Sequence, residues 1–516
     1  MMESFLKGHA FKVENGKFVA SQDISSGTTI LVQRPLAQVP LPSKRHQRCN
    51  YCLGKAQLQC CSRCRSAYFC SNECFQNAWL HFHRILCEPQ TTDIYKSVDA
   101  NRWLLERTAL TLHSHKRLNI QHLQSLLPHM PFSIECLESH APPIPHSPKN
   151  ENPSHAVATF LEPFDCDITE EELSVLWSRI QMSWFLIVEA EHHFEQFAVG
   201  VYPITSLYIG HSCRPNAAAI YIKGVQHIIA LEDISPREPI TISYVDLTAT
   251  KRERWIELRK RFGPDYECDC IRCSGKLQAI DGVLEKGEKE LGLSKKDAVE
   301  LISKHIKSWS VLEMVKEAEI REKDNWSSIE LLAPPEFTHF VGRLATPDIF
   351  HSTTNQKGAV HYKINVAKDR AALLDCIPDV MTMLLSVPKV PSFTTACIKA
   401  AEEVLLERIA QNNWVEASRC SLYLFVAYRL LYPPLHPKLA HHTLVLARAG
   451  WNSMIQMELI GGDKKLERIY AIGTRTWLDL AKDTVEVVFG KESAFWRDVV
   501  ELEWVYDREQ QAKSSN

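Results

Sequence analysis

Hydrophobic and polar positions follow two different patterns in the two halves of the chain. Short runs of β-branched residues beside Gly or Pro, at residues 28–32 and 240–244, predict strands. Apolar residues at helical spacing in residues 102–127 and 170–191 predict helices between those strands. The first half therefore indicates an α+β fold.

Beyond residue 276 the apolar positions keep helical spacing almost to the last residue. Antiparallel helix pairs joined by short turns, such as the turn at residues 431–434, are the simplest packing for such a pattern. Residues 332–362 contain prolines and few apolar stripes, so they indicate an insertion or an exposed loop. The expected helices are residues 297–318, 369–386, 395–411, 414–432, 439–459, 466–490 and 494–506.

Composition and charge place the 516 residues among folded, multi-domain proteins. Hydrophobic residues are 45% and charged residues 23%, and the net charge of -3 lacks the basic excess of a protein that grips nucleic acid, so any such contact must be local. Six basic residues surround Trp255 in residues 251–261, which we interpret as a solvated helix face. Without an apolar run of about 18 residues or a signal peptide, we expect no membrane partner and a location in the nucleus or cytoplasm.

The 17 cysteines supply the most specific chemistry, because thiols that cluster in a reducing compartment usually bind metal. Cysteine and histidine pairs two or three residues apart can hold tetrahedral zinc, and four pairs supply two structural sites whose metals stabilise a short segment. Unconnected buried thiols would not be spaced so regularly. His81 lies off this spacing and is expected at the surface. The four pairs are Cys49–Cys52, Cys61–Cys64, Cys70–Cys74 and His83–Cys87.

A second cysteine set lies in the segment Cys268-x-Cys270-x2-Cys273. These three thiolates need a fourth ligand, and Cys213, some fifty residues upstream, is the candidate. The alternative is a surface motif that binds no metal. The remaining cysteines lie in apolar or mixed segments and are interpreted as core residues: Cys136, Cys166, Cys376, Cys397 and Cys420.

Residues 49–87 resemble a MYND zinc finger, whose pattern includes the aromatic-Cys step at Tyr68-Phe69-Cys70 and a Trp, here Trp79, before the final His. The resemblance implies interleaved pairs, with Cys60 as a spare or an alternative to Cys61. One zinc would then take Cys49, Cys52, Cys70 and Cys74, and the other Cys61, Cys64, His83 and Cys87.

Four ordered motifs resemble the SET domain and post-SET tail of the SET-and-MYND family of protein-lysine methyltransferases. They are the opening segment 18–27, His211-Ser212-Cys213-Arg214-Pro215-Asn216, Ile242-Ser243-Tyr244 and the cysteine motif 268–273. The resemblance implies a SET domain interrupted by a MYND finger, with a C-terminal all-helical, helical-repeat-like domain. The expected parts are the N-terminal SET part 8–48, the finger 49–87, the helical inserted region 88–200 with a Pro-rich loop, the C-terminal SET part 201–250, the post-SET segment 251–275 and the helical domain 276–516.

The resemblance also implies a site for S-adenosylmethionine, with Tyr244 as the catalytic tyrosine and Tyr266 stacked on the adenine. Three departures from the family pattern predict weaker cofactor binding. Asn15-Gly16-Lys17 stands where the family has Gly-x-Gly. Ser183 and Gly210 each stand where the family has an asparagine that faces the cofactor. The expected cofactor-binding positions are Gly16, Lys17, Ser183, Gly210, His211, Tyr244 and Tyr266.

Two functional hypotheses follow from the resemblance. The first is an S-adenosylmethionine-dependent protein-lysine methyltransferase with about three zinc ions, acting on a histone or another protein, and the intact Tyr244 motif favours it. The second is a catalytically silent scaffold in transcriptional regulation. In both, the resemblance implies that the finger binds Pro-rich peptides, and we expect a monomer.

Overall fold

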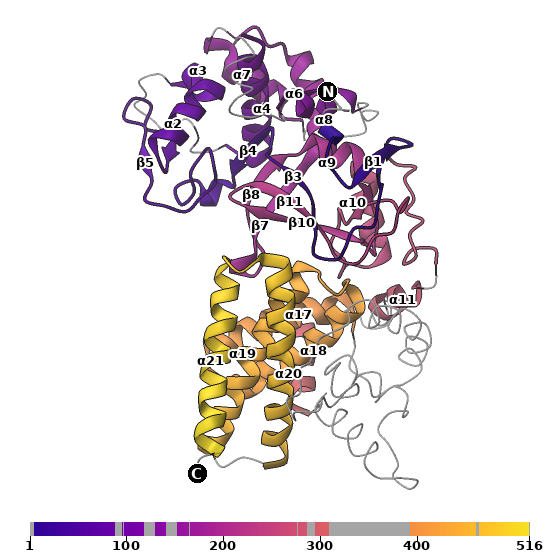
Figure 1. Cartoon of the computed structure of the whole chain (residues 1–516). Helices are drawn as coiled ribbons and strands as arrows, with labels where there is room; N and C mark the ends of the chain where they lie inside the picture. The colour runs from indigo at the N-terminus through magenta and orange to yellow at the C-terminus, as the bar shows by residue number, and fades with distance from the viewer. Residues whose placement is uncertain are drawn as a thin grey trace. The chain divides into compact units, whose positions relative to one another are not determined.

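The computed structural model describes residues 5–87, 95, 98–117, 130–140, 152–164, 166–275, 277–285, 295–308, 393–460 and 464–514 (Figure 1). The chain forms two compact units. The first comprises residues 1–211, 217–242 and 258–266, and the second comprises residues 212–216, 243–257 and 267–516. The predicted helices at 369–386, the predicted loop at 332–362 and Cys376 lie outside the described residues.

The first unit is built around several small sheets rather than one large one. All of their pairings are antiparallel except the short parallel ladder that joins residues 210–211 to residues 241–242. The sheets are β1 (Phe11–Glu14) with β2 (Lys17–Ala20); β10 (Ala217–Ile222), β11 (Val225–Ala230) and β3 (Thr29–Gln33); β4 (Ala37–Pro40), β8 (Glu195–Val201) and β7 (Trp184–Glu189); β9 (Gly210–His211) with β12 (Thr241–Ile242); and β5 (Gln59–Cys60) with β6 (Tyr68–Phe69).

The finger segment and the helical insert share one hydrophobic core. Cys49, Phe69 and Phe82 of the finger pack in the same cluster as Trp103 and Leu104 of α4. The finger is therefore packed against the insert along much of its length. The elements are α2 (Asn72–Ala78), a π-helical turn (Trp79–His83), α3 (Arg84–Leu86), α4 (Ala100–Arg117), α6 (Met130–Ser139), α7 (Ser154–Leu161), α8 (Glu170–Ser183) and α9 (Pro203–Tyr208).

The helix predicted at 170–191 is too long. It begins at a capping box, in which the side chains of Thr169 and Glu172 each accept a hydrogen bond from the other's backbone N–H, and it ends at Ser183. From Trp184 the aromatic and β-branched run forms β7, which pairs with β8. The pairing partner decides this boundary, because apolar spacing alone does not distinguish a short buried strand from a helix.

The second unit is helical, as the apolar spacing predicts. Consecutive helices from α17 to α21 pack on one another (Figure 1). No helix among the described residues has both the length and the hydropathy needed to cross a lipid bilayer. The helices are α10 (Lys251–Phe262), whose last turns belong to the first unit, α11 (Ala279–Glu285), α13 (Lys295–Ser308), α17 (Thr395–Ala410), α18 (Trp414–Leu431), α19 (Pro437–Ile460), α20 (Lys464–Phe489) and α21 (Ala494–Ser514).

Candidate zinc centres and cofactor site

Four cysteines of the finger meet in one tetrad. A tight turn holds the first pair, because Leu53 adopts a positive φ of 61° and its N–H donates to the Cys49 carbonyl at 3.0 Å. The N–H of Gly54 donates to Cys52 Sγ at 3.4 Å, as amides do around metal-bound thiolates. The sulfur atoms of Cys49, Cys52, Cys70 and Cys74 all lie within 4.8 Å of one another.

A second tetrad in the finger has the same construction. Arg65 has a positive φ of 55°, and its N–H donates to the Cys61 carbonyl at 2.9 Å. His83 lies in the π-helical turn, where burial lowers the pKa of its ring to about 4 and so keeps it neutral, as a ligand must be. The ligand atoms of Cys61, Cys64, His83 and Cys87 also lie within 4.8 Å of one another.

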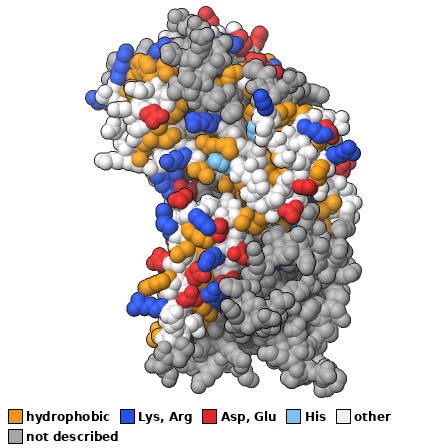
Figure 2. Space-filling view, viewed as in Figure 1, with side chains coloured by type: hydrophobic (Ala, Val, Ile, Leu, Met, Phe, Trp, Pro, Cys, Tyr) orange, Lys and Arg blue, Asp and Glu red, His pale blue; other side chains and the backbone are white. Residues whose placement is uncertain are grey.

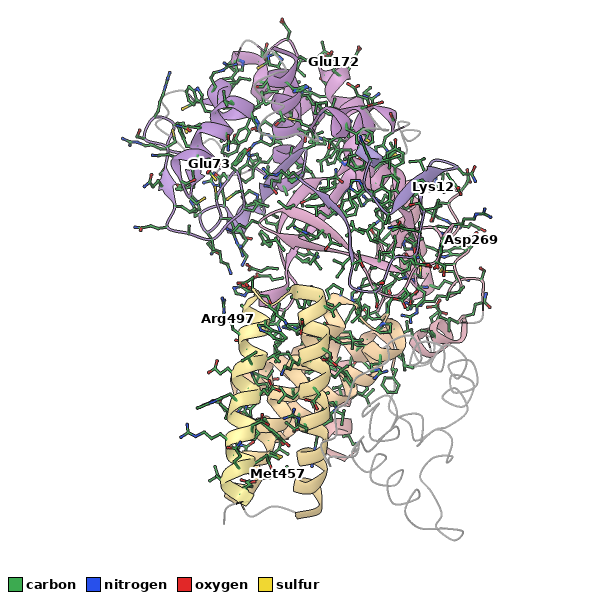
Figure 3. All side chains as sticks on the ribbon, in the orientation of Figure 1. Lys12, Glu73, Glu172, Asp269, Met457 and Arg497 are labelled. Carbon is green, nitrogen blue, oxygen red and sulfur yellow. The ribbon has the colours of Figure 1, made fainter. Side chains whose placement is uncertain are left out.

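The donor atoms of the finger fit zinc. Ligands at the corners of a tetrahedral thiolate site stand about 3.8 Å apart. The sulfur atoms of Cys52 and Cys70 are 3.5 Å apart, and those of Cys61 and Cys87 are 3.7 Å apart. The interleaved pairs are the ones that the family resemblance implies. In Figure 3, Glu73 marks helix α2, which carries Cys74.

Two further residues of the finger, Cys60 and His81, lie close to the zinc ligands in the sequence. Cys60 is exposed and belongs to neither tetrad of the described residues, whereas Cys61 does. His81 is not at the surface: it is 5% exposed, and burial lowers its pKa to about 4. The π-helical turn from Trp79 to His83 widens the helix and turns His81 into the core beside Tyr51, which spacing along an ideal helix could not reveal.

The third tetrad joins the two segments expected from the cysteine spacing. Cys213 lies within 4.8 Å of the three thiols of the post-SET segment, Cys268, Cys270 and Cys273, and its sulfur is 3.6 Å from that of Cys273. All four residues belong to the second unit, and Asp269 marks the segment in Figure 3. Three tetrads of soft ligands therefore fit three zinc ions.

A buried arginine contacts two thiols of this third centre and partly offsets its negative charge. Arg254 is completely buried, its Nε donates to Cys213 Sγ at 3.2 Å, and its second terminal nitrogen lies 3.7 Å from Cys273 Sγ. Asp281 of α11 binds both terminal nitrogens of Arg254 at 2.8 Å and also accepts from the buried Arg272 at 3.0 Å. Burial disfavours the charged guanidinium, but Asp281 and the thiolates more than compensate and raise the pKa of Arg254.

No sequence pattern marks Arg254, Arg272 or Asp281 as part of a zinc centre. Arg254 lies among the six basic residues of the segment interpreted as a solvated helix face, and at Arg254 that interpretation is wrong. The helix does expose Arg252 and Lys260, whereas Arg254 is the basic residue of this helix that is fully buried. No motif marks Asp281, since α11 brings it to the post-SET segment through the fold alone.

Gly16 and Lys17 lie at a hairpin. Asn15 and Gly16 have φ of 50° and 72° between the paired residues Glu14 and Lys17, which is a two-residue turn with positive φ at both positions. The Lys17 ammonium donates to the Leu207 carbonyl at 2.9 Å in the last turn of α9, a favourable position for a cation. Burial lowers the pKa of Lys17.

Gly210 and His211 form β9, which pairs with Thr241 and Ile242 of β12. A Cβ built at Gly210 meets Thr241 Cγ2 at 3.8 Å, an ordinary contact, so a side chain fits there. Ser183 is fully buried, and its hydroxyl has no hydrogen-bond partner within the described residues. That orphaned hydroxyl is compatible with a polar group of a bound ligand.

The two tyrosines expected at the site belong to different units. Tyr266 lies in the first, where its ring packs on Phe262 at 4.8 Å between centroids. Tyr244 lies in the second, in the bend after β12, where the Ser243 hydroxyl donates to the Val245 carbonyl at 2.8 Å. The arrangement of Tyr244 relative to the six cofactor-site candidates of the first unit stays a prediction.

Comparison with known proteins identifies a SET domain in this chain. Residues 18–245 match the family model for the SET domain. The chain is 28% identical over 292 residues to the histone-lysine N-methyltransferase SMYD3 of Mus musculus, and the aligned region covers 55% of this chain and 64% of that protein. It is 24% identical over 293 residues to the histone-lysine N-methyltransferase ASHR1 of Arabidopsis thaliana, covering 54% and 58%.

A third relative is the N-lysine methyltransferase SMYD2 of Homo sapiens, 24% identical over 261 residues, or 50% of this chain and 57% of that protein. The chain thus spans less than two thirds of the length of these relatives. The matched SET region contains the finger with its two tetrads and also Cys213 of the third tetrad, whose other three cysteines follow the region. Residues 18–245 therefore form a SET domain that is interrupted by a segment with two tetrads of zinc ligands, and over about half of its length the chain is similar to these lysine methyltransferases.

Proposed function

We propose that the protein is an S-adenosylmethionine-dependent protein-lysine N-methyltransferase acting on a histone or another protein. The match of residues 18–245 to the SET domain carries this proposal, because it includes Tyr244 within the Ile242-Ser243-Tyr244 motif. The relatives described above are lysine methyltransferases, which supports the same reaction class. Reduced thiols at three zinc centres favour the nucleus or cytoplasm as its location.

The cofactor would supply a methyl group on a sulfonium cation. In the proposed site, Tyr266 offers an aromatic face to the adenine, and Ser183 offers a buried hydroxyl that lacks a partner within the described residues. The backbone of Gly210 and His211 in β9 would line the same proposed site. The Tyr244 phenol would orient the neutral lysine amine towards the methyl group, a contribution of position and electrostatics.

Lys17 is the residue that fits this site least well. Its ammonium donates to the Leu207 carbonyl, which lies one turn before Gly210. At position 17 the family pattern has a glycine, which brings no cationic side chain. A cation near a sulfonium ligand raises the free energy of the bound state. We infer that Lys17 weakens cofactor binding while it holds the end of α9 in place.

The test of the enzyme proposal is titration calorimetry with S-adenosylmethionine, followed by a methyl-transfer assay. We expect binding tighter than about 100 μM, and we expect Tyr244→Phe to abolish transfer while leaving binding intact. Lys17→Met should tighten binding about tenfold, whereas Lys12→Met, an exposed lysine on the same hairpin, should not. No binding at millimolar cofactor would eliminate the enzyme.

The alternative is a scaffold, and one observation on the finger favours a binding role alongside either activity. Phe75, Gln76, Trp79 and Leu80 line an apolar pocket of about 430 Å³ on α2 and the π-helical turn. Aromatic pockets of this kind accept extended Pro-rich peptides. Trp79→Ala should weaken binding of such a peptide while zinc content stays unchanged, and equal binding by both proteins would contradict this role.

A further inference from the structure

The three-stranded sheet of the first unit has an outer face that the proposed reaction does not use. Leu31 and Gln33 of β3 are buried, but Val32 between them points the other way and is 45% exposed. Register places Val32 opposite His227 of β11, and His227 opposite Ile220 of β10. One row of side chains therefore crosses all three strands on this face.

A second row lies beside the first, towards the hairpin that joins β10 to β11. Ile222 pairs with Val225 and is 52% exposed. Arg34 directly follows β3, whose last residue, Gln33, pairs with Gln226. The two rows, with the β3–β4 connection and α6, line a pocket of about 470 Å³. Pockets of this size accept a small ligand or one large side chain.

The hairpin turn beside the pocket is rigidly placed. Lys223 and Gly224 have φ of 49° and 76°, so both positions of the two-residue turn are left-handed. The Tyr202 hydroxyl donates to the Gly224 carbonyl at 2.6 Å. The positive φ of Gly224 disfavours other residues, and a Cβ there would lie 2.0 Å from Gln38 Oε1, so the Gln38 side chain would have to move. The turn thus presents Lys223 at a fixed position on the rim of the pocket.

The charged residues of the pocket are both basic. Its lining contains Arg34 and Lys223 and no acidic residue, and burial lowers the pKa of His227, which favours its neutral ring. Within the described residues, neither Arg34 nor Lys223 forms an ion pair. The whole chain carries a net charge of -3, so this local basic rim does not follow from its overall composition. Figure 2 shows hydrophobic side chains and a histidine near the middle of the view, over β3 and β11, with basic side chains beside them.

We propose that this face, defined by Val32, Arg34, Ile222, Lys223, Val225 and His227, binds an acidic peptide segment of a protein partner that carries a large apolar side chain. The apolar rows would take the side chain, and the basic rim would take the flanking carboxylates. Arg34 and Lys223 follow the ends of two different strands, so together they can contact several carboxylates of one peptide. The apolar floor distinguishes the site from a phosphate-binding surface, which contacts a charged backbone. The site does not depend on methyl transfer.

The test uses the full chain and a fluorescein-labelled synthetic peptide in which a phenylalanine is flanked by pairs of aspartates. We expect saturable binding with a Kd on the order of 10 μM that weakens as salt is added. Arg34→Met combined with Lys223→Met should raise the Kd at least about tenfold, as should Val32→Asp. Arg252→Met, which removes an exposed cation of α10, should leave the Kd unchanged.

Matched peptides separate the two parts of the proposal. A peptide with serine in place of phenylalanine, or with asparagines in place of aspartates, should bind about tenfold more weakly. Equal binding by either peptide, unchanged binding by the double variant, or no saturable binding by the wild-type chain would overturn the proposal. Displacement of the peptide by duplex DNA would assign the basic rim to phosphate instead. Unchanged thermal unfolding of each variant verifies that its fold is intact.

Discussion

At the scale of single residues, the post-SET centre depends on charges that lie outside the cysteine motif. Arg254 and Arg272 are both fully buried, and Asp281 contacts both guanidinium groups. A zinc ion with four thiolates carries a net negative charge, which Arg254 partly offsets through Cys213 and Cys273. Asp281 in turn supplies a negative charge to both buried guanidinium groups, which would otherwise repel each other.

Asp281→Asn should destabilise the second unit. The substitution leaves two buried guanidinium groups with one negative partner fewer, a change that costs about 3 kcal/mol of unfolding free energy. Urea denaturation and the rate of zinc release to a colorimetric chelator measure the effect. Asp269→Asn is the matched control, because Asp269 is exposed in the same segment. Equal stability of both variants would contradict the neutralising role of Asp281.

Adjacent cysteines of the finger give a second prediction at this scale. Cys61→Ser removes a ligand of the second tetrad, so we expect the protein to retain about two zinc ions instead of three and to unfold at a lower temperature. Cys60→Ser should keep all three, because Cys60 is exposed and outside the tetrads. Elemental analysis of both variants counts the metal. Loss of zinc from the Cys60 variant alone would show that the ligands are exchanged.

At the scale of elements, helix α4 anchors the finger to the SET region. The Arg107 guanidinium lies 3.4 Å from the centre of the Phe82 ring and donates to the Asn50 carbonyl at 2.8 Å. One position earlier, Glu106 is completely buried and accepts a hydrogen bond from Tyr95 at 2.8 Å. Burial raises the pKa of Glu106 from 4.5 to about 7, despite the nearby Arg107.

This raised pKa predicts how stability depends on pH. The folded chain binds the Glu106 proton more tightly than the unfolded chain does, so the unfolding free energy falls as pH rises from 4.5 to about 7. Glu106→Gln removes this dependence and keeps an acceptor for Tyr95. Relative to wild type, the variant should gain about 3 kcal/mol between pH 5 and pH 8.

The measurement is urea unfolding of both proteins at several pH values. Because the buried histidines His81 and His83 titrate in both proteins, their opposite contribution cancels in the difference between the two curves. A difference that stays constant with pH would contradict the raised pKa of Glu106.

At the scale of the whole molecule, two kinds of core stabilise the chain. The finger and the post-SET segment bring together metal ligands over short stretches, whereas helices α17–α21 bury residues such as Leu422, Phe425 and Trp477 among themselves. Metal supplies folding energy to the first kind, and burial of apolar surface supplies it to the second. Removing zinc should therefore affect the two unequally.

A strong zinc chelator should release three zinc ions and expose the cysteines of the tetrads to alkylation. We expect most of the helical circular dichroism to remain, because the C-terminal helices need no metal, and the buried Cys397 and Cys420 should stay unreactive. Mass spectrometry of alkylated peptides identifies the reactive cysteines. Complete loss of the helical signal would show that the zinc centres and the helical core unfold as one cooperative unit.

The sequence by itself predicted the ligand pairs, because short-range spacing fixes which thiols a turn brings together, and it predicted most C-terminal helices, because apolar periodicity is local. The interleaving of the pairs into tetrads came from the family resemblance, because it depends on how the fold joins separate turns. Only the tertiary structure decided features that depend on distant partners. Ser183 ends a helix because β8 pairs with the next strand, and Arg254 turns inward because Asp281 and Cys213 meet it there. Long-range contacts of this kind leave no periodic or motif signal in the chain.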